Sequence, residues 1–216
     1  MSKSKSLSRL IASDIGVLIL LALARTLLQV FTNGQYGFHQ DELVTLDAAA
    51  YHLAWGYVAW PPITPLLARV ALSLFGPSVI GLRSFAVLAE GIVMLITGLM
   101  IRDLGGGRWA QILGAVAVAT SPLSIVQGGL FQYETLDYLC WVLLAFTVIR
   151  LLKSENPRWW LGIGAAIGLG IRCLAAGHAF SCARFADLVW LIAHWSALLC
   201  RWSGRYRDAA RGFDDP

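Results

Sequence analysis

The chain has little charge and few cysteines. Only 14% of its 216 residues are charged, while 57% are hydrophobic and the mean hydropathy is +0.65. Its apolar runs repeatedly reach the about 20 residues that a helix needs to cross a bilayer core of roughly 30 Å. A water-soluble domain is therefore a poor interpretation. Because backbone groups in lipid must be paired within the protein, these runs predict an all-α, polytopic helical membrane protein.

Two further absences exclude classes of site and partner. The four cysteines, Cys140, Cys173, Cys182 and Cys200, form no CxxC pair and are too sparse for a disulfide framework, so we predict neither a metal centre nor disulfides there. The formal charge of +4 comes without long basic segments, because the basic residues sit mostly in short clusters between apolar runs. Membrane topology explains such clusters better than a nucleic-acid partner does.

Apolar runs and basic clusters predict five spans and a candidate for a sixth. The first, over about residues 10–31, follows Lys3, Lys5 and Arg9, which indicates an uncleaved anchor helix and an N-terminus in the cytoplasm. Four more spans are predicted, over residues 78–101, 109–126, 136–152 and from 159 onward, with basic cytoplasmic turns at 102–108 and 153–158. Residues 185–200 are the candidate for a sixth.

The segment between the first two spans, residues 32–77, is then predicted to lie outside the cytoplasm. Its block Trp60-Pro61-Pro62-Ile63-Thr64-Pro65 separates two short helices, because proline lacks the amide proton and disfavours helix at the residue before it. The piece from 66 to 75 is too short to span and is expected to lie along the membrane interface.

Two groups of acids are predicted on this same outer face. Asp41 and Glu42 are adjacent, so on a helix they diverge by about 100°, and one would be a general base and the other a structural or metal partner. The alternative is a solvated loop. Glu134 and Asp137 lie at the outer end of the fourth span. If that helix begins at Leu136, Asp137 lies in its first turn, where the helix dipole would favour it without any catalytic role.

Ionisable residues also occur within or near the spans. Arg25, Arg83 and Glu90 each need a partner or a polar cavity there, and the spacing of Arg83 and Glu90 puts them on one helix face. Arg69 and Arg83 are expected near the outer surface. They would either bind a lipid phosphate through paired donors or extend to the headgroups.

The two histidines of the outer segment have less specific roles. His39 and His52 could ligate a metal, but no third ligand at a short fixed spacing supports that, and ordinary polar roles are favoured. Trp55, Tyr57 and Trp60 are typical of the aromatic belt at a membrane interface. No metal is therefore assigned from these residues.

Several segments, taken in order, resemble bacterial members of glycosyltransferase family 39, which is related to protein O-mannosyltransferases and lipid A aminoarabinose transferases. The resemblance covers about residues 10–170. It is carried by FHQDEL at 38–43, HLAWGYV at 52–58, PPITPLLAR at 61–69, GLR at 81–83 and RDLGGG at 102–107. The resemblance implies a GT-C fold, with short interfacial helices in the first outer loop.

The implied activity is transfer of a sugar from a polyprenyl-phosphate donor to a lipid, glycan or protein acceptor at the outer face of the bacterial cytoplasmic membrane. The mechanism would be inverting, with Asp41 as general base. The leaving phosphate needs positive charge from an arginine or a divalent cation, and apart from that cation no cofactor is predicted. The expected catalytic residues are Asp41, Glu42 and Asp137, and the expected substrate-binding residues are Arg69, Arg83, His39 and Glu134.

The chain departs from the family pattern after residue 170. Family members are commonly more than twice as long, and Ile171-Arg172-Cys173 replaces an expected threonine-lysine-tyrosine element. We therefore divide the chain into an N-terminal transmembrane part, 1–170, and an atypical basic, cysteine-rich tail, 171–216, which a change of reading frame would explain. The alternatives to an enzyme are an inactive truncated remnant or a non-catalytic membrane subunit. A transporter would show repeated halves or paired discontinuous helices.

Overall fold

The structure is a computed structural model that describes residues 13–55, 61–154 and 156–173. This part of the chain is all-α, as predicted, and belongs to the first of two units that divide the chain at residue 176. Its eight helices are α2 (Asp14–Asn33), α3 (Gln40–Tyr51), α4 (Ile63–Phe75), α5 (Val79–Asp103), α6 (Arg108–Thr120), α7 (Pro122–Gly129), α8 (Tyr133–Ser154) and α9 (Trp159–Cys173). Two short helices, α3 and α4, are present as predicted, and α4 begins within the proline block, at Ile63.

Several helices of the described part are long and apolar enough for a membrane protein, as predicted. Within the described residues, α2, α5 and α8 are long and apolar enough to cross a bilayer, and α6 with α7 forms a fourth candidate bent by 58°. The span predicted over 109–126 thus corresponds to a bent pair of helices and not to one straight helix. Pro122 keeps Ser121 extended, at φ −62° and ψ 130°, and so breaks the helix there. Helix α9 is shorter, and the candidate at 185–200 lies outside the described residues.

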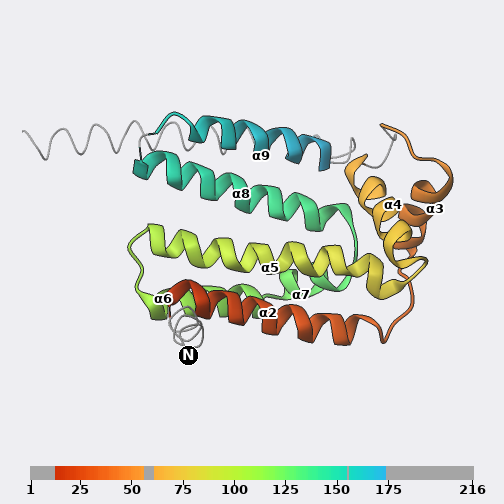
Figure 1. Ribbon diagram of the computed structural model, residues 1–216, viewed down its shortest axis with the longest axis horizontal. Coiled ribbons are helices and arrows are strands. Elements are labelled where there is room, and N and C mark those ends of the chain that lie inside the picture. The colour runs from red at the N-terminus through yellow and green to blue at the C-terminus, as the bar shows by residue number, and fades with distance from the viewer. Residues whose placement is uncertain (1–12, 56–60, 155, 174–216) are drawn as a thin grey trace, which may run out of the picture. The chain divides into compact units, whose positions relative to one another are not determined.

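Helix α5 is the centre of the described part. It packs against α2, α6, α7, α8 and α4, while α9 packs on α8. Figure 1 shows α2, α5, α8 and α9 side by side, with α3 and α4 gathered beyond the first turns of α5. We call this the α3 end. It also holds the C-terminus of α2 and the N-terminus of α8, so both predicted acid groups lie at one end of the helices (Figure 1).

The opposite end carries the basic turns. Arg150 Nε lies 2.6 Å from Asp103 Oδ2, and Lys153 Nζ donates to the Asp103 carbonyl at 2.8 Å, which joins the last turns of α5 and α8. The Arg150 guanidinium also lies over the rings of Phe146 and Trp159, at 5.2 and 5.8 Å from their centroids. The two predicted basic clusters therefore share one end, as a common topology requires.

Three polar side chains of α2 bind helix α7, the second helix of the bent pair. They are spaced four residues apart, so they lie on one face of α2. Each donates to a carbonyl of α7, which pairs backbone groups within an apolar segment. The bonds are Arg25 Nη2 to Ser124 O at 2.8 Å, Gln29 Nε2 to Ile125 O at 2.9 Å and Asn33 Nδ2 to Gly128 O at 2.8 Å.

Gly98 of α5 allows the close packing of α5 on α2. A Cβ added at Gly98 would lie 2.6 Å from Leu18, whose side chain is only 1% exposed and cannot move into solvent. We expect Gly98→Val to destabilise the detergent-solubilised protein by about 1–3 kcal/mol, the usual cost of overpacking. Thermal unfolding measures this. Gly164→Val in α9 is the control, since a Cβ there meets nothing within 4 Å. Equal melting temperatures for the two variants would contradict this packing.

Candidate functional site

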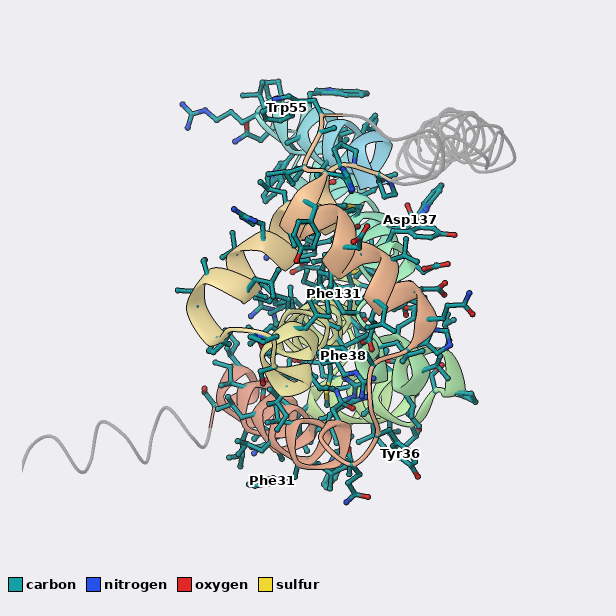
Figure 2. All side chains as sticks on the ribbon, turned by 90° about the vertical axis from the view of Figure 1, so that its right-hand side faces the viewer. Phe31, Tyr36, Phe38, Trp55, Phe131 and Asp137 are labelled. Carbon is teal, nitrogen blue, oxygen red and sulfur yellow. The ribbon has the colours of Figure 1, made fainter. Side chains whose placement is uncertain are left out.

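Glu42 is the buried hub of the α3 end. It occupies the third position of α3, where it accepts from the His39 amide at 2.9 Å and closes a capping box. Arg83 binds it through two donors, Nε to Oε1 at 2.9 Å and Nη2 to Oε2 at 2.8 Å. The Phe131 amide donates to Oε1 at 2.9 Å. Figure 2 looks onto this end and shows Phe131 near its middle. Both carboxylate oxygens are thus engaged, and the side chain is fully buried.

Arg83 is equally engaged. Its Nη1 donates to the carbonyls of Asn33 and Tyr36 at 2.8 and 3.4 Å, and its Nη2 donates to that of Gly37 at 2.8 Å. With the two bonds to Glu42, these use all five N–H groups of the guanidinium. Arg83 therefore ties α5 to α3 and to the turn after α2. No donor remains for a lipid phosphate, which was one of the two roles suggested for Arg83 from the sequence.

Glu90 does not share a partner with Arg83, although both lie on α5. It accepts a hydrogen bond from the Ser124 hydroxyl, and its Oε2 lies 3.8 Å from Arg25 Nη2. Arg25 and Glu90 are both buried between α2, α5 and α7. The ionisable residues of the spans thus find partners, as predicted, but in two separate pairs.

The environment of Glu42 keeps its carboxyl ionised. Burial by itself would raise its pKa, but the hydrogen bonds from Arg83, Phe131 and His39, together with the Arg83 charge, outweigh burial and lower the pKa below the ordinary 4.5. A general base must take up a proton during the reaction, which this carboxylate resists. We therefore assign Glu42, predicted among the catalytic residues, a structural role.

Asp41 combines a fixed orientation with access to solvent. Its side chain is 42% exposed, and its Oδ2 accepts from the Gln132 amide at 2.8 Å. The same oxygen lies 3.5 Å from His39 Nδ1. The Asp41 backbone N–H points to that nitrogen at 3.4 Å, so His39 caps α3. Of the two adjacent acids, Asp41 is the one that a substrate can reach.

The second acid group lies near Asp41. Tyr133, the first residue of α8, interacts electrostatically with Asp41, Glu134 and Asp137. Helix α8 begins at Tyr133 and not at Leu136, so Glu134 and not Asp137 occupies its first turn. The prediction of Asp137 as a first-turn acid is therefore wrong. Asp137 is half-buried in the second turn and lies at the α3 end, above Phe131 in Figure 2.

Arg69 acts at the other end of α3. Its Nη1 donates to the carbonyls of Ala49 and Ala50, at 3.1 and 3.0 Å, in the last turn of that helix. This turn is eight to nine residues from Asp41, about 12 Å along the helix. Arg69 is exposed but is bound at the opposite end of α3 from the acids. The structure therefore does not gather it with them.

A groove of about 400 Å³ lies beside the first turn of α3. Its walls come from α2, the segment 36–39 and α7, and they combine polar with apolar groups; they include Gln29, Thr32, Tyr36, Phe38, His39 and Leu130. His39 lines the groove and also contacts Asp41. In the part of the chain that the structure describes, no three His, Cys, Asp or Glu side chains are grouped to hold a metal ion. The arrangement offers one oriented, accessible carboxylate next to a groove.

Two site features were absent from the sequence prediction. These are Gln132 and the Phe131 amide, which come just before the predicted group from Tyr133 to Asp137 in the chain. Their link to Asp41 crosses about 90 residues, and no spacing rule indicates it. The capping box could have been found, since His39 and Glu42 have its three-residue spacing.

Comparison with known families gives one match. The family model described as dolichyl-phosphate-mannose-protein mannosyltransferase matches residues 59–203, which is more than half of the chain. The match includes Arg69, Arg83, Gln132 and Asp137 and continues past residue 170, while Asp41 precedes it. Comparisons with curated proteins and with solved structures give no match.

Removing Arg83 should be costly, because it leaves a buried carboxylate with only two backbone donors. We expect Arg83→Met to lower the free energy of unfolding in detergent by about 3–5 kcal/mol, as for other buried ion pairs that lose one partner. The control is Arg69→Met, which removes an exposed arginine and should cost about 1 kcal/mol. Denaturant titration of both variants measures this. Similar losses in the two would contradict a buried hub.

Stability should also depend on pH through Glu42. Its folded-state pKa is lowered, so its contribution is complete above the unfolded value of 4.5 and is lost as the pH falls through the lower folded value. We expect the unfolding temperature of the wild type to fall as the pH is lowered below about 4.5, and the decline to be shallower in Glu42→Gln. Parallel curves for the two proteins would contradict the assigned environment.

Proposed function

Because the chain belongs to the dolichyl-phosphate-mannose-protein mannosyltransferase family, we propose that it transfers a sugar from a polyprenyl-phosphate carrier to an acceptor hydroxyl. The family and the apolar helices support a membrane glycosyltransferase of the GT-C type. The acceptor is a lipid, a glycan or a protein. The reaction takes place at the α3 end, on the outer face of the bacterial cytoplasmic membrane, and the N-terminus lies in the cytoplasm.

One observation carries this proposal: Asp41 is an accessible carboxylate fixed beside a buried hub. Asp41 accepts the proton of the acceptor hydroxyl while that oxygen attacks the anomeric carbon of the sugar. The bond between the anomeric carbon and the phosphate oxygen breaks, and the phosphate leaves with the electron pair. Attack from the side opposite the phosphate inverts the anomeric configuration.

The remaining predicted residues have supporting roles in this proposal. His39 lines the groove and touches Asp41, so it contacts the sugar or the phosphate there. Glu134 and Asp137, grouped around Tyr133, bind sugar hydroxyls. Since Arg83 is fully engaged, the counter-charge for the leaving phosphate comes from Arg69 after a rearrangement or from a divalent cation.

Substitution of Asp41 tests the proposal. In membranes supplied with dolichyl phosphate mannose and a panel of other polyprenyl-phosphate sugars, Asp41→Asn should lose about 10²- to 10⁴-fold in transfer rate, the contribution of a general base. Asp47→Asn is the matched control, because Asp47 lies on the same helix and is exposed. It should transfer sugar at the wild-type rate, and both variants should insert equally.

Two results would contradict the proposal. Full activity of Asp41→Asn would remove Asp41 as the base. Absence of transfer by the wild type with every donor would favour the alternative, an inactive remnant or a non-catalytic subunit of the same fold.

A further inference from the structure

We infer that Gln132 is a positioning residue for Asp41, an inference that rests on the proposed function. Its Nε2 lies 2.8 Å from Asp41 Oδ2, a normal distance for a hydrogen bond. The other neighbour of that oxygen, His39 Nδ1, is 3.5 Å away, which is too long for a strong bond. Gln132 is thus the side chain that fixes the Asp41 carboxylate.

The backbone around Gln132 is itself fixed. On one side, the Phe131 amide donates to Glu42 Oε1 at 2.9 Å, and the Phe131 ring is 1% exposed. On the other side, the Thr135 hydroxyl donates to the Gln127 carbonyl at 2.9 Å and is buried. The hub that holds Glu42 therefore also sets the position of Gln132 relative to Asp41, the second residue of α3.

Orientation of the Asp41 carboxylate needs such a donor. The torsion that rotates an aspartate carboxylate has a broad energy profile, so the side chain does not fix its own plane. A carboxylate oxygen accepts from the NH₂ group of Gln132 but would be repelled by the carbonyl oxygen of the same amide. This preference also fixes which way the Gln132 amide is turned. Both Asp41 contacts are made by Oδ2. Oδ1 is then the oxygen that takes the acceptor proton.

A neutral donor suits these surroundings. The charged and titratable groups around Asp41 are His39 and Glu42 on or next to its own helix, Arg83 on α5, and Tyr133, Glu134 and Asp137 on α8. Several of them are acids, which repel the Asp41 carboxylate. The Gln132 amide holds this carboxylate without adding charge near a sugar phosphate.

Kinetics of Gln132 variants test the inference. Gln132→Met removes the donor at similar size, and we expect kcat to fall about tenfold or more with KM unchanged, because the lost bond is one to a charged group. Gln132→Glu keeps the shape but puts a carboxylate against Asp41, so its kcat should fall further. Gln40→Met is the control, since Gln40 is exposed, and it should keep the wild-type kcat.

Thermal unfolding gives a second readout that needs no turnover. Gln132→Glu should lower the melting temperature through repulsion from Asp41. The double variant Asp41→Asn with Gln132→Glu should restore it, because the new amide donates to the new carboxylate. Its turnover should stay lost, since the base is gone. Turnover that recovers together with stability in the double variant would show that Asp41 is not the base, and would overturn the proposed function and this inference together.

The outcomes distinguish a failure of the role of Gln132 from a failure of the proposed function. An active wild type with an unchanged kcat in Gln132→Met overturns the role of Gln132 alone. A raised KM with unchanged kcat also overturns it, because Gln132 would then bind substrate. Failure of the double variant to regain stability overturns the contact itself. A wild type without transfer activity overturns the proposed function and this inference together.

Discussion

The described part of the molecule depends on the buried ion pair between Arg83 and Glu42. It joins α5 to α3, and through further hydrogen bonds it reaches the end of α2 and the residue two positions before α8. Burying two charges is costly unless their remaining donors and acceptors are paired. Here every N–H of the guanidinium and both carboxylate oxygens are engaged. The pair therefore fixes segments that are distant in sequence.

This pair also separates the roles of two adjacent acids. Because Glu42 is buried in the hub, its neighbour Asp41 is held at the surface on a different side of α3, as the 100° step between helix residues requires. The same contacts bring Gln132, the residue after Phe131, next to Asp41. In this way consecutive positions supply a structural acid and an accessible one. Both acids precede the residues that match the family, and Arg83 and Gln132 within that match contact them.

Sequence features that act over a few residues predicted the structure well, whereas contacts between residues distant in the sequence were not predicted. The proline block predicted α3 and α4 correctly because the missing amide proton acts within a few residues. The apolar run over 109–126 indicates a span, but hydropathy does not indicate the 58° bend at Pro122. The sequence suggested that Arg83 binds a lipid phosphate or extends to the headgroups, and that it lies on one helix face with Glu90. Its true partner, Glu42, is 41 residues away, and only tertiary packing determines that pairing.

The most direct test of the central claim is carboxyl labelling of the folded protein in detergent, read residue by residue by mass spectrometry. The hub predicts that a water-soluble carbodiimide with an amine nucleophile labels Asp41 and leaves Glu42 unmodified, and that Arg83→Met makes Glu42 reactive. Equal labelling of Asp41 and Glu42 in the wild type would contradict the division of roles on which the account rests.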